Sequence, residues 1–395
     1  MNNNIEPRRP SRLILGLANI TLGTYMKNKY HLIINNQIND IKPPYIIISN
    51  HASVFDPYLI GTAMYPQLIN FVGSYSTFYN RKIGWIIKKI GTISKFQYQN
   101  DFIAMRQMFN VIKSNRVLGL FPTGRLPSCG EGMPVTASLV KMLIKMNVPI
   151  VSAHFDGAYL TRPKWSNIVR IGQINLGLKV LLTTEQLQHL KIEEILTIIN
   201  DDLYYNDYAW QKQHRIVFKN GDNAEGMEKL LYLCPKCQHE NTIVTEKNVL
   251  KCSSCGLTMQ LDTYGLFENN PYFTSPDEWF RYLEQQAMEI TQSDFIFEDD
   301  TQVEGVLNNK IQVIGNGHLT LTPQGILFQG KLNQKEREIM FKIENLPSLP
   351  YKIGTNFEMA DDKEVYRFVV SNPRDIVKWS LIVEAMYKKV NSTKE

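Results

Sequence analysis

Three short apolar runs alternate with segments of helical periodicity in the first part of the chain. The runs occupy residues 45–49, 117–121 and 148–155, and the helical patterns cover residues 103–114 and 135–146. Strands that alternate with helices indicate an α/β layer fold, which usually binds its ligands beyond the carboxyl ends of the strands. The pattern therefore predicts an α/β domain with its site along one edge of the sheet.

The size and polarity of the chain favour several globular domains. Its 395 residues exceed the usual size of one hydrophobic core, and 44% of them are apolar. The mean hydropathy is -0.23, and no uncharged apolar stretch is long enough to cross a bilayer. The first ten residues are polar and no signal-peptide cleavage site follows them. These features predict a cytoplasmic protein without a membrane span.

Basic residues are concentrated in two segments. Residues 1–30 hold five basic residues and one acidic residue, and residues 81–116 hold eight basic residues and the single Asp101. Both segments are expected to attract anions, although each could also be a solvated basic face. Between Arg12 and Tyr25, leucine and isoleucine mix with small residues, which predicts a helix that lies on a membrane surface. A helix that caps the first domain is the alternative.

His51 and Asp56 follow the first apolar run. An imidazole can take a proton from an alcohol near neutral pH if a second group fixes its tautomer. Residues five apart in one helix point about 140° away from each other, so His51 must stand in a turn before the helix. Pro57 fits a helix that begins at this point. We predict that His51 is a general base oriented by Asp56, with a structural histidine as the alternative.

The second apolar run ends in a tight turn that carries a cation. Phe121 and Pro122 lead into Thr123 and Gly124, and Arg125 comes next. A guanidinium can hold a phosphate through two parallel hydrogen bonds. A surface arginine is the alternative. The two turns together indicate deprotonation beside an anion site.

Three sequence blocks show a resemblance to a known family. NHASVFDP (residues 50–57), LFPTGRLPSCGEG (residues 120–132) and VPIVSAHFDG (residues 148–157) resemble, in order and spacing, those of the glycerolipid acyltransferases, which include the bacterial lysophosphatidic acid acyltransferases. The resemblance implies a PlsC-like fold. It further implies that His51 deprotonates the acceptor hydroxyl, that Asp56 orients His51, and that Arg125 holds the acceptor phosphate during attack on an acyl thioester. No acyl-enzyme is required.

The chain departs from the family pattern at two places near the expected substrate site. Thr123, next to Gly124, stands where the family usually has glutamate, and a hydroxyl brings no charge. The middle block is recognisable from Arg81 to Ile93, and Lys95 stands near the position of the family's arginine. The resemblance implies that Thr123, Gly124, Arg125 and Lys95 contact the substrate.

Four of the five cysteines form two CxxC pairs. Cys234 and Cys237 are separated by fourteen residues from Cys252 and Cys255. This spacing predicts a zinc ribbon, in which four thiolates make a closed structural site. Disulfides are the alternative and are disfavoured in a reducing compartment. The region from Asp207 to the end of the LDTYGLF segment also resembles an extension found in a bacterial subgroup of these acyltransferases.

The last hundred residues contain short strand-like runs and a final helical pattern, which resemble a pleckstrin-homology (PH) or GRAM-like module. The sequence therefore predicts five parts: a basic, apolar membrane-surface helix (residues 1–30), an acyltransferase domain (residues 31–228), a zinc ribbon (residues 229–265), a connecting helix (residues 266–298) and a strand-rich module with a C-terminal helix (residues 299–395).

The resemblance implies an O-acyltransferase of phospholipid biosynthesis that acts at the inner face of the cell membrane. The expected partners are the membrane surface, an acyl donor (acyl-CoA or acyl carrier protein) and a lysophospholipid acceptor, 1-acylglycerol-3-phosphate above all. Glycerol-3-phosphate is the alternative acceptor, and a non-catalytic lipid-binding scaffold on a degenerate domain is the alternative function. Nucleic acid is not an expected partner, because Glu240 and Glu246 offset the lysines of the ribbon.

Overall fold

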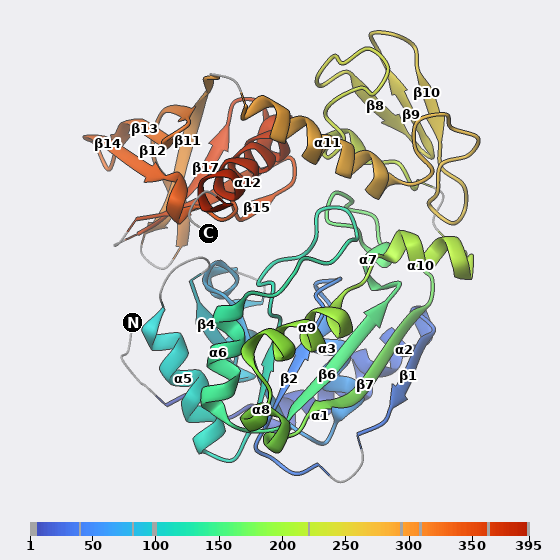
Figure 1. Ribbon diagram of the computed structural model, residues 1–395, viewed down its shortest axis with the longest axis vertical. Coiled ribbons are helices and arrows are strands. Elements are labelled where there is room, and N and C mark those ends of the chain that lie inside the picture. Colours follow the sequence, from blue (N-terminus) through green and yellow to red (C-terminus); the bar gives the residue numbers. More distant parts are fainter. Residues whose placement is uncertain are drawn as a thin grey trace. The chain divides into compact units, whose positions relative to one another are not determined.

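The computed structural model divides into two compact units. It describes residues 6–38, 41–80, 83–96, 101–219, 222–292, 295–307, 310–361 and 364–392. The first unit comprises Met1–Pro163 and Val169–Asn220, and the second comprises Lys164–Ile168 and Gly221–Glu395 (Figure 1). The short segment Lys164–Ile168 thus belongs to the second unit, although the chain on both sides of it belongs to the first.

A seven-stranded sheet forms the centre of the first unit, in the order β1-β7-β6-β2-β5-β3-β4. Strand β2 pairs in parallel with β5 and β6, and β3 pairs in parallel with β5 and β4, whereas β7 runs antiparallel to β6. Strand β7 lies outside the predicted apolar runs. The strands are β1 (Leu32–Asn36), β2 (Tyr45–Ser49), β3 (Ile69–Ser74), β4 (Ile93–Lys95), β5 (Val117–Leu120), β6 (Ile150–Asp156) and β7 (Ile174–Leu182).

Helices cover both faces of this sheet, with α5, α6 and α9 on one face and α1 to α3 on the other (Figure 1). Apolar side chains of α5, α6 and α9 pack in one core with those of β2, β5 and β6. The α/β fold predicted from the alternating runs is thereby confirmed. The helices are α1 (Arg12–Ala18), α2 (Thr24–Lys29), α3 (Asp56–Met64), α4 (Gly84–Lys89), α5 (Phe102–Lys113), α6 (Ala137–Met146), α7 (Ala158–Thr161), α8 (Thr184–His189), α9 (Ile192–Leu203) and α10 (Asp207–His214).

The N-terminal segment forms a nearly continuous helix. Helices α1 and α2 are joined by a π-helical turn, Asn19–Gly23. Three large apolar side chains point to solvent: Leu13 is 87% exposed, Leu17 66% and Ile20 72%. Such a row of exposed apolar groups is uncommon on a helix that packs only within its own domain. Among the described residues, no helix is both long and apolar enough to cross a bilayer.

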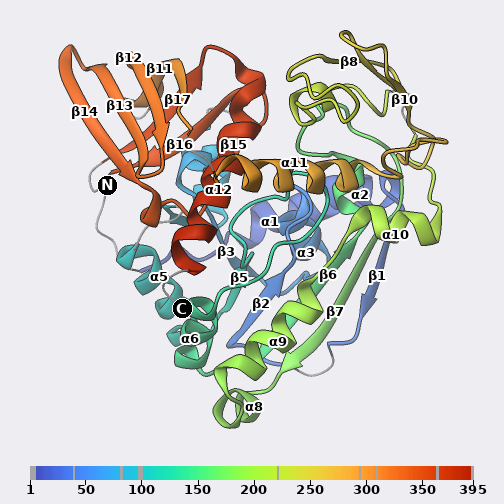
Figure 2. The same cartoon turned by 45° about the horizontal axis from the view of Figure 1, so that its top comes forward.

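The second unit contains two sheets and two long helices (Figure 2). A small sheet of order β10-β9-β8 lies in the region of the two cysteine pairs, and a seven-stranded antiparallel sheet of order β14-β13-β12-β11-β17-β16-β15 follows. The small sheet comprises β8 (Ile243–Glu246), β9 (Val249–Cys252) and β10 (Thr258–Gln260), and the large one β11 (Phe297–Leu307), β12 (Lys310–Thr322), β13 (Gly325–Leu332), β14 (Lys335–Lys342), β15 (Tyr351–Lys352), β16 (Asn356–Ala360) and β17 (Val365–Val370).

Helices α11 (Pro276–Ile290) and α12 (Ile376–Ser392) pack against these sheets. The indole N–H of Trp279 on α11 donates to the carbonyl of Leu233, which precedes the first cysteine pair. The ring of Trp379 on α12 lies against Phe297 and Phe357 of the large sheet. The strand-rich module and its terminal helix agree with the predicted fold class, and the likeness to a PH or GRAM-like module stays a prediction.

The start of α11 is held by contacts other than a serine cap. Ser275 occupies the N-cap position, but its hydroxyl accepts no hydrogen bond from the helix. Instead, the carboxylate of Glu278 accepts hydrogen bonds from the backbone amide and the hydroxyl of Thr274. A carboxylate in the first turn also interacts favourably with the helix dipole. These contacts lie directly before and within the first turn of the helix, which begins at Pro276.

Candidate active site

The two predicted turns follow neighbouring strands. Because β2 and β5 are paired in parallel, with Ile48 opposite Leu120, their carboxyl ends reach the same edge of the sheet. His51 stands two residues beyond β2, and Thr123 to Arg125 follow β5 closely. Adjacent strands are only about 4.8 Å apart. The two turns therefore leave the sheet side by side.

His51 and Asp56 are in direct contact. The Nδ1 atom of His51 lies 2.9 Å from Oδ2 of Asp56, and the imidazole is only partly exposed. His51 stands in the turn before α3, and Asp56 is the first residue of that helix, with Pro57 after it. This is the arrangement that the sequence required for the pair to meet. An ionised carboxylate accepts a hydrogen bond from the Nδ1–H group. The lone pair of Nε2 therefore remains for another partner.

The carboxyl group of Asp56 is fully buried. Its Oδ2 atom also accepts hydrogen bonds of 2.8 Å from the backbone amides of Ala52 and Ser53. Burial raises the pKa of Asp56 above its ordinary value, and the hydrogen bonds from His51 and from the two amides oppose that rise. Three donors on one oxygen favour the charged form that a histidine base needs behind it. His51 is thus paired with a carboxylate whose orientation is fixed by hydrogen bonds.

The ring of Phe121 packs against the imidazole of His51. The rings of His51 and Phe121 are stacked, with centroids 4.2 Å apart and an angle of 30° between the planes. Phe71 of β3 lies behind Phe121 with a centroid separation of 6.0 Å. Stacking limits rotation of the imidazole about its side-chain bonds. The sequence pattern does not mark Phe121 as a site residue, because an aromatic residue that ends an apolar run also fits simple core packing.

The turn from Thr123 to Arg125 is tightly folded. The amide of Gly124 donates to the carbonyl of Phe121 at 2.9 Å, and Gly124 has a φ of 65°, which only glycine adopts without strain. The hydroxyl of Thr123 donates to the carbonyl of Arg125 at 3.1 Å. The Nε atom of Arg125 contacts the sulfur of Met133 at 2.9 Å, and the side chain is half-buried. The arginine is thereby held on the loop beside His51.

Lys95 lies farther along the same edge. It ends β4, which is three strands from β2 in the sheet order, a lateral distance of about 14 Å. Its ammonium group donates to the carbonyl of Phe96 at 3.0 Å, and burial lowers its pKa. The structure therefore does not bring Lys95 into contact with the His51 pair. The first two residues of the middle block, Arg81 and Lys82, lie outside the described residues.

Asn50 and Tyr205 are two further residues that sequence analysis did not assign to the site. The side-chain amide of Asn50 donates to the carbonyl of Phe155 and accepts from its amide, both at 2.8 Å, so it fixes β2 against the end of β6. The hydroxyl of Tyr205 donates to the carbonyl of His51 at 3.0 Å. The position of Asn50 within the NHASVFDP block was a usable signal. Tyr205 lies far along the chain in a segment without a motif.

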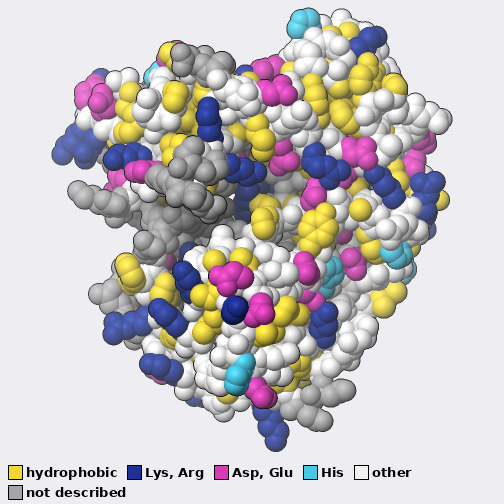
Figure 3. Space-filling model, viewed as in Figure 1, with side chains coloured by type: hydrophobic (Ala, Val, Ile, Leu, Met, Phe, Trp, Pro, Cys, Tyr) yellow, Lys and Arg dark blue, Asp and Glu magenta, His cyan; other side chains and the backbone are white. Residues whose placement is uncertain are grey.

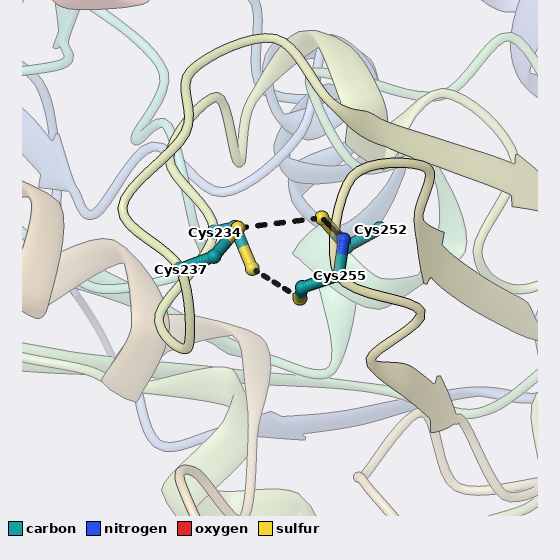
Figure 4. Close-up of side chains that lie close together, drawn as sticks. All are labelled: Cys234, Cys237, Cys252 and Cys255. Atoms are coloured by element: carbon teal, nitrogen blue, oxygen red, sulfur yellow. Dashed lines mark hydrogen bonds between the residues drawn. The ribbon is translucent and has the colours of Figure 1, made fainter.

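The four predicted cysteines converge in the second unit (Figure 4). The Sγ atoms of Cys234 and Cys255 are 3.8 Å apart, those of Cys237 and Cys252 are 3.7 Å apart, and all four lie within 4.8 Å of one another. A disulfide requires about 2.05 Å, so these pairs are not disulfides. Four sulfurs at about 2.3 Å from one zinc ion are about 3.8 Å apart in a tetrahedron.

The surroundings of the cysteine cluster also suit thiolates. Cys252 Sγ accepts a hydrogen bond from the amide of Cys255 at 3.5 Å and lies 3.3 Å from the hydroxyl of Thr242. Gly256 after the second pair has a φ of 72°, which lets the chain turn back toward the sulfur atoms. The donor set and its spacing therefore fit a four-cysteine metal site.

Comparisons with known proteins agree with the geometry of the first unit. The sequence model of the family described as Acyltransferase matches residues 28–155. A 1-acyl-sn-glycerol-3-phosphate acyltransferase of Bacillus subtilis is 21% identical over 159 residues, which are 40% of this chain and 77% of that protein. A 1-acyl-sn-glycerol-3-phosphate acyltransferase of Saccharomyces cerevisiae is 27% identical over 177 residues, which are 42% of this chain and 56% of that protein.

A crystal structure of the 1-acyl-sn-glycerophosphate (LPA) acyltransferase PlsC from Thermotoga maritima aligns with a TM-score of 0.42 and 16% identity, over 51% of this chain and 79% of that one. The residues matched by the family model contain the His51 pair and the turn that carries Arg125. The first unit therefore carries an acyltransferase domain, matched over residues 28–155, that is similar in sequence to two 1-acyl-sn-glycerol-3-phosphate acyltransferases.

Proposed function

We propose that the protein transfers a fatty acyl group from an acyl thioester to the free hydroxyl of 1-acylglycerol-3-phosphate. The observation that carries the proposal is the 2.9 Å contact between His51 Nδ1 and Asp56 Oδ2 beside the Arg125 turn. The curated relatives named above carry the corresponding name. A base and a phosphate-binding cation on neighbouring turns suit an acceptor with a hydroxyl and a phosphate a few bonds apart.

The proposed reaction needs no covalent enzyme intermediate. His51 Nε2 takes the proton of the acceptor hydroxyl while that oxygen attacks the thioester carbonyl. The resulting tetrahedral carbon then releases the thiol, which receives the proton from the imidazolium, so a carbon–sulfur bond is exchanged for an ester bond. Asp56 stabilises the imidazolium through Nδ1, and Phe121 keeps the ring in one plane.

The remaining predicted site residues act on substrate binding in this proposal. Arg125 holds the phosphate of the acceptor, and the Gly124 turn presents the guanidinium at the edge of the sheet. Thr123 offers a neutral hydroxyl to the glycerol oxygens. Lys95 is too far along the edge to touch the reacting atoms, and we assign it to the phosphates of the acyl donor or to a lipid headgroup.

We further propose that the first unit works on the cytoplasmic surface of the cell membrane. Leu13, Leu17 and Ile20 of the N-terminal helix are exposed next to basic residues. On the face drawn in Figure 3, Lys and Arg side chains lie among hydrophobic ones over α5 and α6, where Phe102 and Ile103 are also exposed. Such mixed surfaces bind anionic lipid headgroups and the adjoining acyl region.

The cysteine cluster is proposed to hold a structural zinc ion. Its four sulfurs occupy all positions of a tetrahedral site, so no position remains for a substrate. Zinc therefore has no part in the acyl transfer. It would fix the two knuckles of the small sheet, on which α11 packs through Trp279.

A panel of acceptors tests the proposal. Purified protein is supplied with labelled acyl-CoA or acylated carrier protein and with 1-acylglycerol-3-phosphate, glycerol-3-phosphate or other lysophospholipids. We expect product with 1-acylglycerol-3-phosphate, and none from His51→Ala, while His189→Ala on exposed helix α8 keeps wild-type turnover. Product only with glycerol-3-phosphate would replace the proposed acceptor. Turnover by a folded His51→Ala protein would exclude the mechanism, and absence of product with every acceptor would favour the lipid-binding scaffold.

A further inference from the structure

Tyr205 joins a distant part of the chain to the catalytic turn. Its side chain is buried, at 5% exposure, and its hydroxyl donates to the backbone carbonyl of His51 at 3.0 Å across 154 positions of sequence. It lies between the end of α9 at Leu203 and the start of α10 at Asp207. This segment is outside the residues that match the acyltransferase family model. The contact therefore joins a segment outside the matched range to the His51 turn.

Tyr205 donates a hydrogen bond to a peptide group whose amide in turn donates to Asp56. The carbonyl of His51 and the amide of Ala52 belong to the same peptide unit. The carbonyl accepts from Tyr205, and the amide donates to Asp56 Oδ2 at 2.8 Å. A peptide group bonded at both ends is fixed in direction, and a hydrogen bond at its oxygen strengthens its N–H as a donor. Tyr205 therefore acts on the carboxylate that orients His51 without touching either side chain.

The same segment also contacts the loop that carries Arg125. The amide of Gly132 donates to the carbonyl of Tyr205 at 2.9 Å, and the amide of Asp207 donates to the carbonyl of Gly130 at 3.0 Å. A Cβ atom at Gly132 would meet the Tyr205 ring at 2.8 Å, so ring and loop are closely packed. Residues 205–207 thus contact both the turn after β2 and the loop segment from Gly130 to Gly132, which follows the Arg125 turn.

We propose that Tyr205 is a positioning residue for acyl transfer, which locks the His51–Ala52 peptide and keeps the Asp56–His51 pair aligned with the Arg125 loop. The inference rests on the proposed function of the first unit. Tyr205 is suited to this task because burial and the nearby carboxylates of Asp207 and Asp56 raise its pKa well above the ordinary value, so the hydroxyl stays a donor throughout the working pH range.

Tyr205→Phe removes only the hydroxyl and keeps the ring packed against Gly132. We expect kcat to fall about five- to tenfold with the KM values of donor and acceptor unchanged, because alignment is lost but the binding groups are not. Tyr204→Phe is the matched control, since Tyr204 is exposed and its hydroxyl reaches Glu131. An unchanged kcat in Tyr205→Phe, or an equal loss in Tyr204→Phe, overturns the inference.

A glycine pair gives a second test of the same contact. Gly132→Ala pushes a methyl group into the Tyr205 ring, whereas Gly61→Ala in α3 meets nothing within 4 Å. We expect a fall in kcat only in the first variant. A rise in KM by the same factor, with kcat unchanged, would show that the segment shapes the substrate pocket and would overturn the positioning role.

A spectroscopic measurement separates failure of this inference from failure of the proposed function. In protein with isotope-labelled histidine, we expect the His51 Nδ1 proton to exchange with solvent several-fold faster in Tyr205→Phe than in wild type or Tyr204→Phe. This readout needs no substrate. Faster exchange supports the positioning role even if no acceptor gives product, and unchanged exchange together with unchanged kcat refutes it even if acyl transfer is demonstrated.

Discussion

Two of the side-chain clusters described above differ in how they use their polar atoms. Just beyond β2, one ring nitrogen of His51 is hydrogen-bonded to Asp56, and the other ring nitrogen is not part of this pair. In the second unit, four cysteine sulfurs all face one another within 4.8 Å. A site that performs chemistry has to leave an atom for its substrate, whereas a site that holds a fold uses every ligand internally. We therefore propose that the first cluster carries out the reaction and that the second stabilises the fold.

The largest expected effect tests the reactive cluster. Asp56→Asn keeps the size of the side chain but removes the charge that fixes the His51 tautomer, so kcat should fall by about a hundred- to a thousandfold. Steady-state kinetics with the proposed acceptor measures it, and the melting temperature shows whether α3 still begins normally. Near-normal kcat in the folded variant would remove Asp56 from the mechanism.

A substitution in the cysteine cluster should lower the stability of the protein and leave the acyl-transfer step unchanged. Cys237→Ser removes one of four ligands, so the protein should lose its bound zinc, and the second unit should lose about 3 kcal/mol or more of unfolding free energy. Metal analysis and thermal melting measure both changes. Cys129→Ser, a cysteine outside the cluster, should keep the metal. Full zinc content in Cys237→Ser would contradict a four-cysteine site.

Substitutions of Arg125 test whether this residue binds the substrate or takes part in the chemical step. Arg125→Lys keeps the charge and loses the planar fork, so we expect KM for the phosphate-bearing acceptor to rise about tenfold, and further for Arg125→Ala, with a smaller change in kcat. Arg106→Lys on the exposed face of α5 is the control and should leave KM unaltered. If KM stays constant in both Arg125 variants, the phosphate binds elsewhere.

Thr123→Glu restores the carboxylate usual in the family. It should preserve transfer to 1-acylglycerol-3-phosphate or raise it by up to about tenfold, since a carboxylate accepts stronger hydrogen bonds than a hydroxyl does. Thr123→Ser, which keeps the hydroxyl, gives the baseline in the same assay. A large loss in Thr123→Glu would indicate a pocket shaped for a different acceptor.

The smallest effect concerns Asp207, whose carboxylate accepts hydrogen bonds from the amides of Gly157 and Tyr159. Burial raises its pKa from 3.8 to about 7, with Asp156 adding to the rise and His154 opposing it. The unfolded chain therefore releases this proton at lower pH than the folded protein does, and stability falls as pH rises from about 4 to 7. Asp207→Asn should flatten the profile of unfolding free energy in that window. A profile identical to that of the wild type would exclude this linkage.

Much of the fold followed from short-range patterns. The apolar runs became β2, β5 and β6, and the helical periodicities became α5 and α6, because burial of one face decides both kinds of element locally. Strand β7 is one of the strands that were not predicted. It lies at the antiparallel side of the sheet, and its place depends on packing against β6 and β1, which no local pattern encodes.

The sequence alone determined the pairs whose members lie close in the chain. Asp56 reaches His51 because only a short turn separates them and Asp56 is the first residue of α3. Each CxxC pair closes its own knuckle, so local backbone geometry is enough in both cases. Only the tertiary structure decided which turns share an edge: β5 pairs with β2, Lys95 is three strands away, and Tyr205 donates to His51 from 154 residues further on. Strand order and long-range contacts arise from the competition of whole elements for one buried core, and a local sequence pattern carries little of that information.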